Sequence, residues 1–244
     1  MKVRFAGCGD AFGSGGRWQT CIHLAGEGQV LLVDCGATSL VALKAQGLDP
    51  GAVDAVVVTH LHGDHFGGLP FLILDGQFSR RSAPLRVAGP PGIGARLAEA
   101  MEVLFPGSSQ ARRRFPVQVT ELRTDGTPAT VGAATVRGWE VEHACGAPPL
   151  ALRVELGGTS FAYSGDTQWT AALAEAADGA DLFAVEAYTF DQPVRYHLDY
   201  QTLHAHLGEI RARRIVLTHM SAAMLARLAD ADLPAAYDGM TASL

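Results

Sequence analysis

Short apolar runs that lead directly into a histidine or an aspartate are the feature that most restricts how this chain can fold. Runs such as VLLV, AVVV and RIVL are rich in β-branched residues and are bounded by polar residues and glycines, which predicts short buried strands. The residues that follow or close such runs are Asp34, His60, His143, Asp166 and His219. Because loops at strand ends can point side chains into a common cleft, we expect these side chains to gather at one edge of a sheet.

The densest group of such residues lies in the segment VVVTHLHGDHFGGLP. His60, His62, Asp64 and His65 fall within one turn of chain directly after an apolar run. A histidine-rich polar loop is the simpler interpretation, but imidazoles and a carboxylate at this density desolvate and repel one another unless something binds them. Together with the residues at the other strand ends, the cluster predicts a metal site. Imidazole and carboxylate ligands without thiolate suit zinc, manganese or iron(II).

The order of the expected elements predicts an α/β fold. Strands and helices come first, then mostly strands with glycine turns, then helices alternating with strands. Two sheets packed face to face, with helices outside, would bury every apolar face, and we expect one domain over residues 1–244. The helices are expected at 38–47 (capped by Thr38), 67–78, 92–105, 169–177, 200–212 and 221–230, followed by a short tail.

Five short motifs give this chain a resemblance to a known family. HLHGDH has the pattern H-x-H-x-D-H, and VDCG, EH, SGDT and LTHM accompany it in order along the chain. With these motifs the chain resembles the metallo-β-lactamase superfamily, and within it the ribonuclease Z-like branch. The resemblance covers nearly the whole chain. It implies an αβ/βα four-layer sandwich with a binuclear metal site at one edge of the sheets.

The resemblance also implies a role for each residue of the expected site. Two divalent metal ions per chain are implied, with zinc preferred and manganese or iron as alternatives. The first metal would be held by His60, His62 and His143, the second by Asp64, His65 and His219, with Asp166 bridging both. Asp34 would orient the ligands from behind them. Two such ions can share a bridging hydroxide, which is a nucleophile at neutral pH.

Two further residues are implied as catalytic beside Asp64. The segment AVEAYTF resembles the branch's HEATF segment and places Glu186 at a functional carboxylate. His197 falls where the family has a histidine that acts with this carboxylate near the leaving group, although Leu198-Asp199 stands where Ser-Thr is usual. A histidine held by a carboxylate can serve as a general acid for a departing oxygen. The simpler interpretations are that Glu186 is an ordinary polar residue at a strand end and that His197 is a surface loop residue.

The substrate expectation rests on what the chain lacks relative to ribonuclease Z. The segment from His143 to Asp166 is short, and we find no room for the inserted basic arm that grips tRNA. The formal net charge of -6 also disfavours unaided binding to nucleic acid. We therefore expect a phosphodiesterase acting on small phosphodiesters or cyclic nucleotides. A tRNA 3′-processing endoribonuclease, a lactone or ester hydrolase and a non-enzymatic binder remain as alternatives.

The remaining expectations concern the cysteines, the cell compartment and one loop. The four cysteines form no C-x-x-C pair, and Cys145, although near His143, is expected to be structural. With no signal-like start and no apolar run long enough to span a membrane, we expect a cytoplasmic protein, as a homodimer. The loop from Gly7 to Gly16 holds five glycines. It is either a mobile turn or a ligand-contacting loop in which Arg17 and Trp18 face a substrate.

Overall fold

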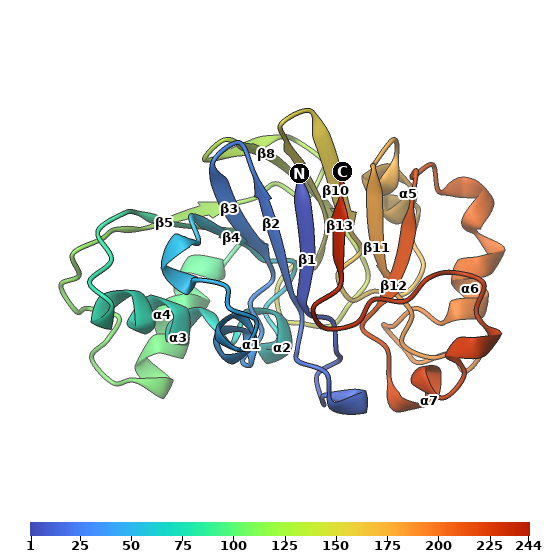
Figure 1. The fold of residues 1–244 in the computed structure, drawn as a ribbon, viewed down its shortest axis with the longest axis horizontal. Helices are drawn as coiled ribbons and strands as arrows, with labels where there is room; N and C mark the ends of the chain where they lie inside the picture. The colour runs from blue at the N-terminus through green and yellow to red at the C-terminus, as the bar shows by residue number, and fades with distance from the viewer.

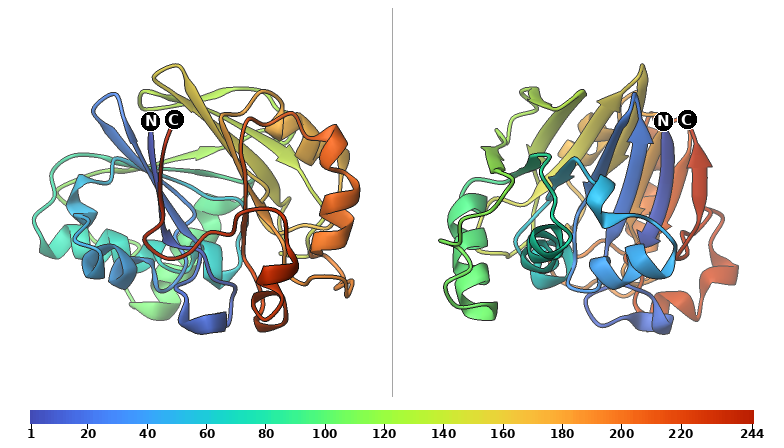
Figure 2. Two further views of the ribbon diagram at one scale, coloured as in Figure 1. Left: turned by 45° about the vertical axis from the view of Figure 1, so that its right-hand side comes forward. Right: turned by 60° about the vertical axis from the view of Figure 1, so that its left-hand side comes forward.

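Two β-sheets pack face to face in the computed structural model, which describes all residues from 1 to 244. Helices α1–α4 cover the outer face of one sheet and α5–α7 that of the other, so the molecule has four layers (Figure 1, Figure 2). This is the αβ/βα sandwich that was predicted.

The first sheet has seven strands in the order β13-β1-β2-β3-β4-β5-β6. Its strands are β1 (Lys2–Gly7), β2 (Cys21–Gly26), β3 (Gln29–Val33), β4 (Ala55–Val57), β5 (Leu85–Gly89), β6 (Val117–Glu121) and β13 (Thr241–Ser243). Neighbouring strands from β3 to β6 run parallel, and a helix or a short connection joins each strand to the next. Their carboxyl ends therefore meet at the same edge.

The second sheet has six strands in the order β12-β11-β10-β9-β8-β7. Its strands are β7 (Ala129–Val131), β8 (Ala134–Glu140), β9 (Leu150–Leu156), β10 (Thr159–Tyr163), β11 (Leu182–Glu186) and β12 (Ile215–Thr218). The strands from β7 to β10 are antiparallel, as the glycine turns predicted, and β10, β11 and β12 are parallel.

Most of the helices occupy the predicted segments. They are α1 (Ser39–Ala45), α2 (Gly63–Phe66), α3 (Leu69–Phe78), α4 (Ile93–Leu104), α5 (Ala171–Ala177), α6 (Tyr200–Ala205) and α7 (Ala222–Leu225), with 3₁₀ turns at Ser14–Gly16, Pro50–Ala52, Leu207–Glu209 and Leu228–Asp230.

Three buried clusters of side chains hold the layers together. The largest lies between the two sheets and includes Phe5 and Leu24 from the first sheet and Phe161 from the second. A second cluster joins the first sheet to α1, α3 and α4, and a third joins the other sheet to its helices. Burial of these apolar side chains is the main force that holds the two sheets at a fixed separation.

Several expectations about individual elements were wrong. Only a short tail was expected after the last helix, but residues 241–243 form β13 and pair antiparallel with β1. His143 was expected to end a strand, but β8 ends at Glu140 and His143 lies in the loop after it. The predicted helices 200–212 and 221–230 are each a short helix followed by a 3₁₀ turn. The hydroxyl of Thr38 accepts a hydrogen bond from the Gln19 amide at 2.9 Å and does not cap α1.

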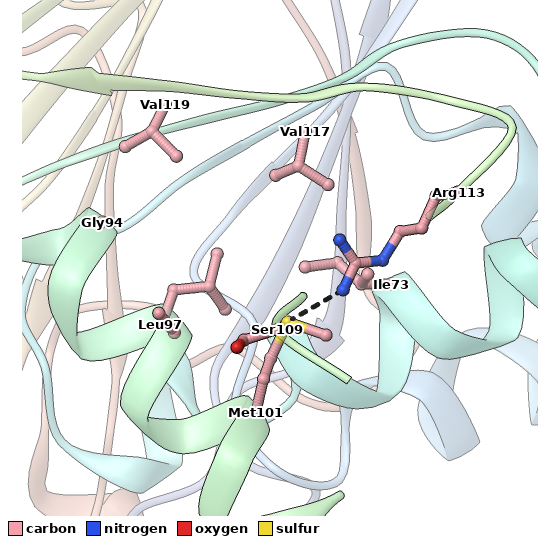
Figure 3. A pocket seen from close by; sticks show the side chains of 9 residues that line it. Ile73, Gly94, Leu97, Met101, Ser109, Arg113, Val117 and Val119 are labelled. Carbon is pink, nitrogen blue, oxygen red and sulfur yellow. Dashed lines mark hydrogen bonds between the residues drawn. The ribbon is translucent and has the colours of Figure 1, made fainter. Parts of the chain in front are cut away.

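A cavity of about 190 Å³ lies between α3, α4 and β6 (Figure 3). Its lining is mostly aliphatic, with Ile73 and Leu97 facing Val117 across it. The guanidinium of Arg113 reaches into it and contacts the sulfur of Met101 at 3.7 Å and the carbonyl of Ser108. This cavity is built from the helical layer and contains none of the expected site residues.

Candidate metal centre

All seven expected metal ligands come together where the strands of the two sheets end. Their donor atoms form two groups, and within each group the atoms lie within 4.8 Å of one another. The first group consists of His60, His62 and His143, and the second of Asp64, His65, Asp166 and His219. Residues from the first sheet and from the second contribute to both groups, so the site lies at the seam between the two sheets.

Asp166 belongs to the second group and also lies near a member of the first. Its Oδ1 is 3.1 Å from His65 Nε2. Its Oδ2 is 3.3 Å from His219 Nε2 and 3.9 Å from His60 Nε2. The two carboxylate oxygens therefore face histidines of both groups.

Donor atoms face one another elsewhere in the cluster too. Nε2 of His143 is 3.0 Å from Nδ1 of His62, and Nε2 of His65 is 3.3 Å from Nε2 of His219. Oδ2 of Asp64 completes the second group at 3.3 Å from His219 Nε2. Ring nitrogens at these distances either share a proton, one donating and the other accepting, or bind a cation between them.

The backbone turns sharply where it delivers these side chains. Asp34 and His219, each the first residue after its strand, have φ values of 60° and 54°, in the left-handed region. Non-glycine residues in this region are held there by surrounding structure, and they cluster at functional sites. The loop after β3 also packs tightly on the start of α3, because a Cβ on Gly68 would lie 2.2 Å from the carbonyl oxygen of Gly36.

Asp34 fixes the ring of His65 from behind. Its fully buried carboxylate lies 2.6 Å from His65 Nδ1 and accepts hydrogen bonds from the amide of Thr59 at 2.7 Å and from its hydroxyl at 2.8 Å. Burial raises the pKa of Asp34, although the His65 charge and these hydrogen bonds oppose the change. The expected orienting position of Asp34 agrees with this geometry, since the bond at Nδ1 leaves His65 Nε2 directed at the site.

Two contacts that the sequence did not suggest orient other ligands. The Thr59 hydroxyl is 3.0 Å from Nδ1 of His60, and the carbonyl of Tyr196 is 2.9 Å from Nδ1 of His143. Tyr196 has a φ of 70°, so a strained backbone position presents this carbonyl. In principle Thr59 could have been noticed beside His60, but the Tyr196 contact depends on a loop 53 residues away in sequence.

The electrostatics of the cluster differ from one histidine to the next. Burial would lower the pKa of His65 and of His219, but the carboxylates of Asp166 and Asp64 outweigh it and raise both pKa values. Burial, reinforced by the neighbouring His65, holds the pKa of His60 well below its ordinary value. Burial would raise the pKa of Asp166, but the charges of His219 and His65 outweigh it and hold that pKa well below its ordinary value. Nε2 of His60 is buried without a hydrogen-bond partner. An unpaired buried nitrogen aimed at a carboxylate, in a set of nitrogen and oxygen donors only, fits a divalent cation.

Glu186 and His197 form a pair beside this cluster. Glu186, at the end of β11, is fully buried and accepts a hydrogen bond from the Thr167 amide at 2.8 Å. Its Oε1 contacts Nδ1 of His197 and lies 3.4 Å from Nδ1 of His219. Burial of the His197 ring favours its neutral form, but the hydrogen bond with Glu186 and that carboxylate's charge outweigh burial and raise the pKa of His197.

His197 is further held by an aromatic neighbour that the sequence did not single out. The ring of Tyr188 stacks on the His197 ring, with centroids 4.5 Å apart and planes 28° apart. No local signal distinguished Tyr188 from other residues after a strand, because the contact depends on the fold of residues 189–197.

These residues surround a cavity of about 200 Å³. It is lined by His62, Asp64, His143, Asp166, His197 and His219, with Ala11, Phe12 and Tyr188. The Gly-rich loop therefore contacts the cavity, but through Ala11 and Phe12 and not through the residues considered from the sequence. Arg17 donates a hydrogen bond to the Ala236 carbonyl at 2.8 Å, and neither Arg17 nor Trp18 lines the cavity.

Cys145 belongs to neither ligand group. It is buried, and its thiol donates a hydrogen bond to the Ala147 carbonyl at 3.0 Å, in line with the expected structural part. All four cysteines are free thiols.

Comparisons with known proteins agree with this geometry. A family model described as the beta-lactamase superfamily domain matches residues 29–220. A ribonuclease Z from Mycobacterium marinum is 31% identical over 228 residues, which cover 82% of this chain and 78% of the relative. The chain belongs to the metallo-β-lactamase superfamily, in its ribonuclease Z-like branch.

Other relatives and solved structures match over shorter or longer stretches. A ribonuclease Z from Salinibacter ruber is 42% identical over 105 residues, which span 43% of this chain but only 31% of that protein. The crystal structure of the short form of human tRNase Z superposes with a TM-score of 0.81 at 25% identity, covering 100% of this chain and 99% of the other. A diphosphatase of the PhnP family shares the fold, with a TM-score of 0.77 at 16% identity.

No helix of the structure combines the length and the apolar character that crossing a membrane requires.

Proposed function

We propose that this protein is a binuclear metal-dependent phosphodiesterase that hydrolyses small phosphodiesters, cyclic nucleotides among them. The observation that carries the proposal is the pair formed by Glu186 and His197, in which the His197 ring lines the same cavity as five of the seven clustered histidines and aspartates. A metal cluster alone serves many hydrolases. A histidine held by a buried carboxylate beside that cluster adds a proton donor, which phosphodiesters with poor leaving groups need.

The two groups of donor atoms would hold the two ions. His60, His62 and His143 would hold one, Asp64, His65 and His219 the other, and Asp166 both. Zinc is the preferred identity, with manganese or iron as alternatives. When bound, such a pair supplies Lewis acidity and a nucleophile derived from water at neutral pH.

The chain's own residues hold and move the leaving-group proton. Because Nδ1 of His197 bonds to Glu186, Nε2 is the ring nitrogen left to donate a proton to the departing oxygen. Tyr188 restricts rotation of the ring by stacking on it. Glu186 itself is fixed by the Thr167 amide and contacts His219, so the proton donor and the ligand cluster share one carboxylate.

The preference for a small substrate is supported by the shape and charge of the chain. Between His143 and Asp166 the chain forms only a loop, the strands β9 and β10 and the turn between them. The formal net charge of -6 offers little attraction for the backbone of RNA. The relatives named ribonuclease Z make tRNA 3′ processing the main alternative substrate. Lactone or ester hydrolysis is the alternative that the metal ligands alone would permit.

The test measures metal content and turnover together. Protein purified without chelator and supplied with zinc or manganese is expected to hold close to two ions per chain and to hydrolyse bis-p-nitrophenyl phosphate. Asp64→Ala is expected to lose most turnover and part of the metal, whereas Asp232→Ala, at a side chain 88% exposed, should behave as the wild type. Turnover of a lactone panel without turnover of the phosphodiester, or protein free of metal, would refute the proposal.

The molecule is further proposed to act as one domain over residues 1–244 and as a homodimer in a reducing compartment such as the cytoplasm. The core shared between both sheets supports the first point, and four free thiols support the last. A second copy of the chain is the proposed cover for the exposed side chains of Phe71, Val103 and Leu104 on α3 and α4. Light scattering after gel filtration tests the dimer, with Val103→Asp as the variant expected to weaken it.

A further inference from the structure

The cavity at the metal centre offers a substrate very few contacts other than the clustered ligands. Apart from histidines and aspartates, its lining consists of Ala11, Phe12 and Tyr188, and it contains no lysine or arginine. The phosphate of a substrate would therefore be held at the ligand cluster. The rest of the substrate has only these three side chains to contact.

Phe12 is the most exposed large apolar side chain of the molecule. Its relative exposure is 85%, although it stands at the rim of a polar cavity. One exposed apolar residue is ordinary on a protein surface, so its exposure alone assigns nothing. Phe12 differs from the other exposed apolar side chains in two ways: it lies at the cavity, and hydrogen bonds hold the loop that carries it.

Buried polar groups hold the backbone around Phe12 in place. The carboxylate of Asp10, only 1% exposed, accepts hydrogen bonds from the amides of Phe12 at 3.3 Å and Ser14 at 2.8 Å and from the Ser14 hydroxyl at 2.7 Å. The side chain of Gln19 donates to the Ala11 carbonyl at 3.0 Å. A loop that uses a buried carboxylate to fix three donors presents its tip in a defined position.

The root of this loop is joined to the metal centre itself. The amide of His219 donates to the Cys8 carbonyl at 3.1 Å, two residues before Asp10. The segment that leads from this loop into β2 is equally constrained, because a Cβ on Gly7 would lie 2.0 Å from the carbonyl oxygen of Gln19. Phe12 is thus positioned relative to a clustered histidine through backbone contacts.

The faces of the Phe12 ring are also free of stacking partners within the protein. Tyr188, the other aromatic ring of the lining, stacks on His197 and so has one face covered. Phe12 stacks on no aromatic ring of the chain. An exposed ring with a free face, held beside a phosphate-binding centre, matches how proteins contact a nucleobase.

We propose that Phe12 is the stacking platform for a nucleobase, so that the phosphodiester bound at this site is a nucleotide. The inference rests on the proposed phosphodiesterase function and adds the substrate class and the residue that selects it. Stacking is tolerant of base identity, because every base has a π-face. Purine and pyrimidine nucleotides should therefore both bind, and compounds with the same phosphate but no base should bind more weakly.

The first test compares two substrates with the same leaving group in protein supplied with zinc or manganese. They are the p-nitrophenyl ester of a nucleoside 5′-phosphate and methyl p-nitrophenyl phosphate. Loss of one base–aromatic stack corresponds to about 5- to 150-fold in binding. Phe12→Ala is expected to raise KM for the nucleoside ester within that range, leaving kcat and the methyl ester nearly unchanged.

Two control variants complete the set. Phe12→Trp retains an aromatic ring and should keep the low KM, and Phe78→Ala removes a ring that is 83% exposed on α3 and does not line the cavity. Because Phe12 is exposed, its replacement should leave the fold intact. Equal KM changes for both substrates, or no change for either, would overturn the inference while leaving the phosphodiesterase proposal standing.

A binding measurement decides the inference even if neither ester is turned over. Calorimetric titration of the metal-loaded protein compares adenosine 5′-monophosphate with ribose 5-phosphate, which differ by the base. The wild type should bind the nucleotide at least fivefold more tightly, and Phe12→Ala should remove that difference. Absence of turnover with this binding pattern intact would refute the phosphodiesterase proposal alone, and equal binding of the two compounds would refute the part assigned to Phe12.

Discussion

At the residue scale, the contact between Glu186 and His197 gives one nitrogen a defined task. Nδ1 bonds to the carboxylate, and in the proposed mechanism Nε2 carries the proton that a leaving oxygen would receive. The same carboxylate raises the pKa of His197, which keeps the ring protonated to a higher pH than an isolated histidine. Glu186 thus affects both the position of the ring and its protonation state, and the two effects can be tested separately.

His197→Ala should slow phosphodiesters with alkoxide leaving groups far more than those with nitrophenolate. General acid catalysis typically contributes about 10²- to 10⁴-fold, and nitrophenolate departs without a proton. We expect a loss in that range for a ribose alkoxide and a loss of less than about tenfold for p-nitrophenolate, measured as kcat. His204→Ala, at a histidine with its side chain 54% exposed on α6, is the matched control. Equal losses on both substrates would remove His197 from the proton transfer.

Glu186→Gln should move the alkaline limb of the pH profile. With Glu186 in place, the raised pKa keeps His197 protonated, so turnover of a poor leaving group falls as pH rises through that raised value. Without the carboxylate the pKa drops, because the two largest interactions that oppose burial of the ring are lost and only the smaller effect of the Asp166 charge remains. The fall should therefore begin at lower pH, as seen in kcat/KM against pH. A limb at the same pH in both proteins would show that another group titrates there.

At the scale of elements, strands with a buried face could be predicted and the contacts between distant loops could not. The run at 55–57 is apolar throughout because β4 is buried on both sides, and that composition predicted it. The residues of β13, Thr-Ala-Ser, carry no such pattern, because two of the three are exposed and the strand exists by pairing with β1. A pairing between opposite ends of a chain leaves no local signal.

The candidate site divides in the same way. His60 and Asp166 could be proposed as ligands from the sequence, because they are metal-binding residue types beside the ends of predicted strands. The Tyr196 carbonyl and the Phe12 ring could not, since their positions depend on hydrogen bonds such as those of Asp10 to its loop. The prediction of one continuous helix over 200–212 was also wrong. Asp199 caps its start as a sequence would suggest, at 2.9 Å from the Thr202 amide, but the chain leaves the α-helix after Ala205 and forms a 3₁₀ turn around Gly208.

Deleting residues 241–244 should lower stability and spare catalysis. The deletion removes the ladder between β13 and β1, together with the bond from the Leu244 amide to the Met1 carbonyl. Backbone bonds of this kind contribute about 1 kcal/mol each, so we expect a loss of about 2 kcal/mol and a fall of about 4–8 °C in the melting temperature. Thr241→Ala keeps the backbone bonds and should melt near the wild type. Loss of activity in folded truncated protein would show that β13 supports the site.

At the scale of the whole molecule, the negative charge should govern how it meets RNA. Binding to tRNA is expected to be weak, because few cationic contacts hold the phosphates, and to weaken with salt, because those contacts are electrostatic. A filter-binding or fluorescence titration between 50 and 200 mM salt measures the slope, about -0.9 per phosphate contact for duplexes. Tight binding at physiological salt with release of a 3′ trailer from a precursor would instead favour the tRNA-processing alternative.

The placement of the ligands at the seam between the sheets has a consequence for folding. His65 and His219 face each other across 154 residues of sequence. An ion held by both would act as a cross-link that closes a very long loop, and such closures restrict the unfolded chain most. Chelator should then lower the melting temperature of the wild type by more than it lowers that of Asp64→Ala, as scanning fluorimetry would record. The metal would then link directly two halves of the chain that otherwise associate through hydrophobic packing.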